Sequence, residues 1–299
     1  MKRRQQGILT GMPFMANVAP RTFVDAQGRK LFFAKAPSRV VSMAPNVTEI
    51  LFALGVADRV VAVTESCDFP PEAKLKTQLK GTTPSIEQIL ALKPDLVLLP
   101  EDFIQPGLMQ QLDRLKVPAF VLQAASLEDV LLQIQTVARM LDRSQAGDVL
   151  AASMRQRMAA VKDRLQALPR PRILYVLNTE PLQSVGPGSF IHQLIELAGG
   201  ENIAAGASGA YPRLSLEDVI ARDPECIVFP VGDEEGIPED EQQQWRRWSQ
   251  LSAVQHDRLV SVPSVLIDRP GPRLVEGLEL LAKAIHPEAY PGGILEQKP

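Results

Sequence analysis

Short apolar runs alternate along the chain with longer segments in which apolar residues recur every three or four positions. The runs predict buried strands, and the longer segments predict amphipathic helices. The strands expected are 39–43, 60–63, 96–99, 119–122, 172–176, 226–229 and 259–262. The helices expected are 48–54, 106–116, 126–142, 190–197 and 273–284, with short ones after Ser85 and Ser215. Strands that alternate with helices predict an α/β fold with parallel sheets covered on both faces.

One segment, 144–168, has no strand pattern and predicts a single long helix. Its apolar residues, Val149 among them, recur at helical spacing, and Pro169 and Pro171 end it. A helix of about 24 residues is about 35 Å long, enough to run the length of a lobe. The expected fold is two Rossmann-like lobes with parallel sheets, joined by one long α-helix. The expected segments are an N-terminal segment with a hairpin (1–36), a first lobe (37–143), the linker helix (144–168), a second lobe (169–287) and a loosely ordered tail (288–299).

A similar pattern of fifteen residues occurs at 85–99 and again at 215–229. In both copies a serine, Ser85 or Ser215, is expected to cap a short helix, and a proline follows that helix and leads into an apolar strand. Two copies this far apart indicate two related lobes rather than a solenoid. The cleft between two lobes is the natural place for a ligand.

Glu87 and Glu217 occupy the same place in the two copies, in the first turn of each helix. A glutamate there usually only stabilises the helix dipole, by about 0.3–1 kcal/mol. Because the same carboxylate recurs on both lobes, the pair is also suited to present two charges to a symmetric basic partner.

The composition narrows the possible functions. The chain has 299 residues, of which 45% are hydrophobic and 22% charged, with a net charge of −3, and its Lys and Arg residues are scattered. This balance does not favour nucleic-acid binding. Two cysteines and three widely separated histidines predict neither a disulfide framework nor a metal site. There is no G-x-S-x-G nucleophile motif, so no enzyme is expected, although a catalytic triad drawn from distant residues stays open.

The N-terminus only weakly resembles an export signal. Basic residues 2–4 precede a short apolar stretch that Pro13 interrupts, and small residues over 16–19 are spaced like a cleavage site. No run approaches 18 apolar residues, so no spanning helix is expected. Retention in the cytoplasm stays open as an alternative.

Several loops that follow predicted strands contain candidate ligand-binding residues, since open α/β sheets bind ligands there. Prolines and a glycine stiffen the loop 268–273, which would hold the Arg269 guanidinium in place for a ligand; the alternative is a surface pair with Asp268. Gly186 and Gly188 could present backbone N–H groups to an anion, or form a tight turn before a helix capped by Ser189. The other candidates are Ser66, Asp68, Phe69 and Tyr211.

Taken together, several motifs resemble the class III periplasmic binding proteins of ABC importers for cobalamin and ferric siderophores. The motifs are RVVSMAPNVTE (39–49), LKPDLV (92–97), GPGS (186–189), LAGGENI (197–203), ARDP (221–224) and RPGPR (269–273). The resemblance covers residues 22–287. It implies a non-catalytic protein without a cofactor, monomeric and periplasmic or otherwise extracytoplasmic, with two lobes joined by one long helix. It also implies docking on a permease dimer with ATPase subunits through one glutamate per lobe, here Glu87 and Glu217.

Within that family the chain looks most similar to the cobalamin-binding branch. Tyr211 matches an aromatic position of that branch, and Arg269 matches an arginine near the ligand. Other aromatic positions of the branch are occupied here by Ser66, Gly81 and Pro100. The expected ligand is cobalamin or a related corrinoid. A ferric siderophore or haem is the alternative within the family, and a cytoplasmic cofactor-handling protein or enzyme on the same scaffold is the alternative outside it.

Overall fold

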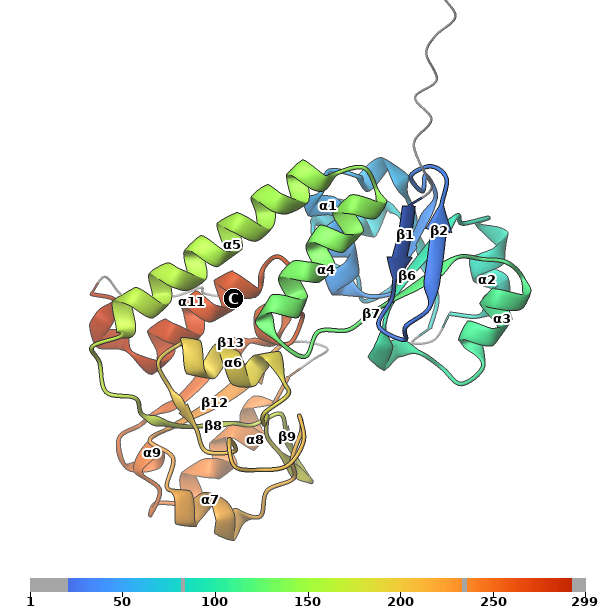
Figure 1. Cartoon of the computed structure of the whole chain (residues 1–299). Helices are drawn as coiled ribbons and strands as arrows, with labels where there is room; N and C mark the ends of the chain where they lie inside the picture. Colours follow the sequence, from blue (N-terminus) through green and yellow to red (C-terminus); the bar gives the residue numbers. More distant parts are fainter. Residues whose placement is uncertain (1–20, 82–83, 233–235, 292–299) are drawn as a thin grey trace, which may run out of the picture.

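The computed structural model describes residues 21–81, 84–232 and 236–291 and has two lobes joined by a long helix (Figure 1). Both lobes are built on a parallel sheet, so the predicted α/β fold class is confirmed. The predicted export signal at the N-terminus lies outside the described residues. Among the described residues, no helix is both long and apolar enough to cross a membrane.

The first lobe contains a five-stranded parallel sheet in the order β5-β4-β3-β6-β7. Its strands are β3 (Val40–Ser42), β4 (Val60–Thr64), β5 (Thr77–Leu79), β6 (Leu96–Pro100) and β7 (Ala119–Leu122). Its helices are α1 (Pro45–Ala53), α2 (Ile86–Ala91), α3 (Leu108–Arg114) and α4 (Leu127–Met140), with short 3₁₀ turns η1 (Ala57–Arg59), η2 (Pro71–Leu75) and η3 (Glu101–Phe103). Alternate side chains of β6 enter two separate cores: Leu96 and Leu98 pack with α1 and α4, whereas Val97 and Leu99 pack with α2 and α3.

The second lobe contains a four-stranded parallel sheet in the order β11-β8-β12-β13. Its strands are β8 (Arg172–Tyr175), β11 (Glu201–Asn202), β12 (Cys226–Val231) and β13 (Leu259–Pro263), beside a small hairpin of β9 (Asn178–Thr179) and β10 (Leu182–Gln183). Its helices are α6 (Phe190–Leu197), α7 (Leu216–Arg222), α8 (Glu239–Gln244), α9 (Ser252–Gln255), α10 (Ser264–Ile267) and α11 (Leu274–Ile285), with η4 (Trp245–Arg247) and η5 (Pro287–Ala289). Again both faces of the sheet are buried, with Leu174 and Phe229 on one side and Tyr175 and Val228 on the other.

The predicted N-terminal hairpin is present, and it packs on the first lobe. It consists of β1 (Arg21–Val24) and β2 (Lys30–Phe33), paired antiparallel. Its turn covers the edge strand β7, since the backbone N–H of Ala26 donates to the carbonyl of Val121 at 3.1 Å. The hairpin thereby supplies a hydrogen-bond partner to the backbone of this edge strand.

The connecting helix is α5, Ser144–Leu165, three residues shorter than predicted. It runs from the first lobe to the second along one side of the molecule (Figure 1). Its apolar stripe, Met154, Met158, Val161 and Leu165 among others, is buried, but Val149 is 64% exposed and does not belong to it. Arg157 of α5 makes a bidentate ion pair with Glu279 of α11, which links the helix to the second lobe.

Only the first residues of the predicted tail are described, up to residue 291, and residues 292–299 lie outside the described residues. Residues 287–289 form η5, and the ring of Tyr290 lies 4.8 Å from the guanidinium carbon of Arg164 on α5. The partly buried ring of Tyr290 therefore packs against α5 through a cation–π contact.

Candidate functional site

Loops at the carboxyl ends of the parallel strands contain the candidate ligand residues. Ser66, Asp68 and Phe69 follow β4 in the first lobe, and the loop 268–273 follows β13 and α10 in the second. The carboxyl ends of neighbouring parallel strands share one edge of a sheet. In the folded chain these two loops meet across the lobe boundary.

Two arginines of loop 268–273 bind carboxylates of the first lobe. Arg269 Nη1 lies 2.7 Å from Asp68 Oδ1. Arg273 donates from Nε and Nη2 to the two carboxylate oxygens of Glu49 on α1, at 3.0 and 2.6 Å. We call these four residues, Glu49, Asp68, Arg269 and Arg273, the interlobe latch.

The latch is partly desolvated. Glu49 is 4% exposed and Arg269 is 8% exposed. Burial raises the pKa of Glu49 above its usual value, and the hydrogen bonds and charge of Arg273 only partly offset this. The Arg273 guanidinium also lies 3.9 Å above the centre of the Phe69 ring. Loop 268–273 also packs on α1, since a Cβ at Gly271 would lie 3.5 Å from Cα of Asn46, an ordinary van der Waals distance.

The latch includes two residues that the sequence analysis did not single out, Glu49 and Arg273. The available signal was a carboxylate inside the apolar helix 48–54 and an arginine directly before another apolar helix. Of the residues that were predicted, Asp68 and Arg269 are paired with each other, so Arg269 already binds a protein carboxylate. Asp268, the alternative partner considered for Arg269, accepts a hydrogen bond from the hydroxyl of buried Tyr175 at 2.6 Å. Ser66 is half-buried, with its hydroxyl 3.3 Å from that of Thr64.

Gly186 and Gly188 lie beside the loop that contains Tyr211. The backbone N–H of Gly186 donates to the carbonyl of Ala210 at 2.8 Å, and a Cβ at Gly186 would lie only 2.5 Å from the carbonyl oxygen of Gly209. The hydroxyl of Ser189 accepts from the backbone N–H of Ile191, which makes Ser189 the N-cap of α6. The geometry therefore fits the tight-turn alternative, because the Gly186 N–H already has a partner.

Three aromatic side chains remain exposed on loops at the carboxyl ends of strands: Phe69 after β4, Phe103 after β6 and Tyr211 after β11, at 40, 48 and 48%. Partial burial raises the pKa of Tyr211, Asp102 of the first lobe raises it further, and the Ser189 hydroxyl lowers it. Tyr211 therefore lies within electrostatic reach of η3, the turn that contains Phe103. The sequence analysis missed Phe103, which lies three residues beyond Pro100, a position where the cobalamin branch has an aromatic.

Glu87 and Glu217 are exposed on α2 and α7, which lie toward the outer ends of the two lobes (Figure 1). Ser85 and Ser215 cap these helices as predicted, each in a capping box with the residue three positions later, Gln88 or Asp218. Hydrogen bonds from its own backbone N–H and from the Ser85 hydroxyl lower the pKa of Glu87. The carboxylate of Glu87 is therefore charged over a wide pH range.

Within 21–81, 84–232 and 236–291, no three His, Cys, Asp or Glu side chains are grouped closely enough to hold a metal ion. Both cysteines, Cys67 and Cys226, are free and buried. Burial raises the pKa of the Cys226 thiol to about 11, which makes it a poor nucleophile.

Comparison with known proteins gives a consistent result. Residues 40–266 match the family model described as periplasmic binding protein. The vitamin B12-binding protein of Vibrio cholerae is 30% identical over 243 residues, which cover 81% of this chain and 86% of the relative. The crystal structure of periplasmic vitamin B12-binding protein BtuF of Vibrio cholerae superposes with a TM-score of 0.72 at 28% identity, covering 85% of this chain and 98% of BtuF. The periplasmic heme-binding protein RhuT from Roseiflexus sp. RS-1 gives a TM-score of 0.73 at 29% identity, covering 84% of this chain and 99% of RhuT.

Proposed function

Because the chain belongs to the periplasmic binding protein family, whose model matches residues 40–266, we propose that it captures a corrinoid for an ABC importer. The protein would bind its ligand between the lobes outside the cytoplasm, without altering it, and deliver it as a monomer to a permease dimer with ATPase subunits. The observation that carries the ligand class is the set of exposed aromatic rings on both lobes, Phe69, Phe103 and Tyr211. Flat apolar rings suit a large planar macrocycle.

The charges of the latch favour a corrinoid over haem or an anionic siderophore. Haem carries two propionates, and catecholate siderophores are anions, so each needs basic side chains. In this structure Arg269 and Arg273 already bind Asp68 and Glu49. The raised pKa of Tyr211 also disfavours the phenolate that would ligate haem iron. A corrinoid brings its own cobalt ligands and many neutral amides.

Calorimetry tests the identity of the ligand by measuring binding of cyanocobalamin, of haemin, of a ferric hydroxamate siderophore and of a ferric catecholate siderophore. We expect binding of cyanocobalamin alone, weakened about tenfold or more by Phe103→Ala or Tyr211→Ala, since burying an aromatic ring contributes about 1.5–3 kcal/mol. Phe32→Ala, which removes an exposed ring from the hairpin, is the matched control. Tighter binding of haemin, or equal affinity of all three variants, would contradict the proposal.

Docking through Glu87 and Glu217 is part of the same proposal, because equivalent carboxylates on α2 and α7 suit two equivalent basic surfaces of a permease dimer. Reversing both charges, Glu87→Lys with Glu217→Lys, should abolish uptake while ligand affinity stays nearly unchanged. The control reverses two other exposed glutamates, Glu72 and Glu276. Normal uptake by the first pair would refute the docking role. Cell fractionation with N-terminal sequencing of the product tests the extracytoplasmic location.

A further inference from the structure

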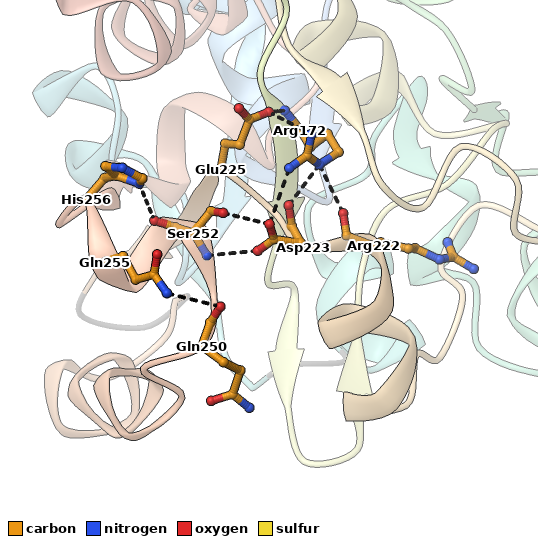
Figure 2. A network of polar contacts seen from close by, with 8 residues as sticks. All are labelled: Arg172, Arg222, Asp223, Glu225, Gln250, Ser252, Gln255 and His256. Atoms are coloured by element: carbon orange, nitrogen blue, oxygen red, sulfur yellow. Dashed lines mark hydrogen bonds and ion pairs between the residues drawn. The ribbon is translucent and has the colours of Figure 1, made fainter.

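The carboxyl end of α7 is held by an arginine from the first strand of its lobe. Arg172 Nε donates to the carbonyl oxygens of Arg222 and Asp223 at 3.0 and 2.8 Å (Figure 2). These two carbonyls end the helix that contains Glu217 and have no partner within it. A cation at this end of a helix also interacts favourably with the helix dipole.

The first lobe has the same arrangement at α2. Arg39, directly before β3, donates from Nε to the carbonyls of Leu92 and Lys93 at 3.2 Å and from Nη2 to that of Leu92 at 2.7 Å. Leu92 and Lys93 correspond to Arg222 and Asp223 in the repeat. Lys93 and Asp223 both adopt a left-handed conformation, with φ of 47° and 42°, so the chain leaves both helices in the same way.

A carboxylate completes each arrangement. Asp95 accepts from the backbone N–H of Arg39 at 2.8 Å, and Glu225 accepts from that of Arg172 at 3.0 Å. In return, the backbone N–H of each acidic residue donates to the carbonyl of its arginine, at 2.9 and 2.8 Å. We call Arg39 with Asp95, and Arg172 with Glu225, the helix braces.

Both braced helices are short, and between their ends they pack mainly through partly buried side chains such as Ile86 and Ile220. α2 has six residues and α7 has seven, too few to be stable alone. Only Ile89 in α2 and Val219 in α7 are fully buried. The direction of each helix therefore depends on its two ends, which are the capping box at the start and the brace at the finish.

We propose that Arg39 and Arg172 are positioning residues for transporter docking: they fix α2 and α7 against the first strand of each lobe and so hold Glu87 and Glu217 in matching orientations. This inference rests on the proposed docking function. It extends that function to residues that need not touch the transporter themselves.

The two braces differ in the contacts around them. Arg172 also forms ion pairs with Asp223 and Glu225, at 3.5 and 3.3 Å. A second difference predicts unequal effects when the arginine is lost. Asp223 also accepts from the backbone N–H and hydroxyl of Ser252, at 2.8 and 2.6 Å, which ties α7 to α9 (Figure 2). Lys93, at the same place in the first lobe, has no carboxylate with which to make such a tie. Loss of Arg39 should therefore disturb its helix more than loss of Arg172.

The test measures binding of the protein, loaded with cyanocobalamin, to its permease–ATPase complex in nanodiscs. Arg39→Met should weaken docking about two- to fivefold, the range expected for one helix-end interaction, and Arg172→Met should weaken it less. Ligand affinity should not change. Arg155→Met, which removes an exposed ion pair with Glu128 on other helices, is the matched control and should dock normally.

A double-mutant cycle separates positioning from general destabilisation. If Arg39 acts through Glu87, Arg39→Met should cause little further loss in a Glu87→Gln background. The inference would be overturned if the fold-losses in docking affinity from Arg39→Met and Glu87→Gln multiplied in the double variant, or if Arg39→Met docked normally. Either result would leave the docking role intact. Normal docking of Glu87→Gln with Glu217→Gln would instead overturn the docking role itself. If Arg39→Met folds poorly, Arg39→Lys, which keeps the charge but loses the fork that reaches two carbonyls, should show the same dependence on Glu87.

Discussion

At the residue scale, the most consequential contact is the ion pair of Glu49 and Arg273, which joins α1 to the start of α11 across the lobe boundary. Removing two charges from water is unfavourable, and their attraction repays this only when the geometry is good. Here the pair is bidentate, and the Glu49 side chain is almost fully buried. Such a pair contributes little net stability, but each partner becomes costly to leave alone.

The first prediction concerns the loss of one partner. Arg273→Met should lower the free energy of unfolding by about 3 kcal/mol, because it leaves the Glu49 charge buried without a partner. Adding Glu49→Gln should restore most of the lost unfolding free energy, since it removes that charge. Urea unfolding measures both variants. Equal losses in the single and double variants would show that packing of Arg273 on Phe69, and not the charge, is what matters.

The second prediction concerns pH. The pKa of Glu49 is raised in the folded chain above its value of 4.5, so the folded state binds the proton more tightly than the unfolded state. The stabilisation from this group is therefore fully present below about pH 4.5 and is lost as the pH rises through the folded pKa. Relative to Glu49→Gln, the parent should lose unfolding free energy as the pH rises above about 4.5. A difference that stays constant with pH would contradict the raised pKa.

At the element scale, most strands and helices could be predicted from the sequence because their periodicity is local. The N-caps Ser85 and Ser215 were likewise visible as serines before apolar helices. The buried face of α5 was harder to predict. Val149 fits the helical spacing but faces solvent, because the start of the helix packs onto α4 through Gly147 instead. Which apolar residue of a helix is buried depends on the neighbouring element, and the sequence of the helix itself does not contain that information.

A third prediction belongs to α11. Gly277 lies inside this helix, where alanine would normally be better by about 1 kcal/mol. A Cβ at Gly277 would, however, lie 2.2 Å from the backbone carbonyl oxygen of Leu266 in α10. Gly277→Ala should therefore destabilise the protein by about 1–3 kcal/mol, as overpacking does. Thermal unfolding measures the change in stability, with Glu276→Ala, an exposed substitution in the same helix, as the control. Stabilisation by Gly277→Ala would mean that α10 can move away.

At the scale of the whole molecule, the lobes are joined by the latch, by α5 and by contact of α4 with α6, where the backbone N–H of Leu127 donates to Gln193 Oε1 at 2.9 Å. Neither latch pair could be predicted, because Glu49 and Arg273 are separated by 224 positions and no local pattern relates them. The folded topology brings them together by placing the carboxyl ends of both sheets face to face. The candidate loops could be found from their position after strands, but Phe103 could not, since its exposure depends on the turn η3.

A fourth prediction concerns the latch as a whole. Spin labels at Leu115→Cys in the first lobe and Gln250→Cys in the second should give one narrow distance distribution, and both native cysteines are buried and do not compete for the label. Glu49→Gln with Asp68→Asn should broaden it, because the latch loses both carboxylates and α5 remains as the covalent link. Glu128→Gln, outside the latch, should leave it narrow. An unchanged width in the latch variant would mean that other contacts hold the lobes.

The placement of the indoles affects how unfolding of this protein is observed. The chain has two tryptophans, Trp245 and Trp248, and both lie in the second lobe beside α8. Tryptophan fluorescence will therefore report unfolding of the second lobe alone, and unfolding of the first lobe will not change it directly. The substitution Phe120→Trp, at a buried position of β7, would let fluorescence report unfolding of the first lobe as well.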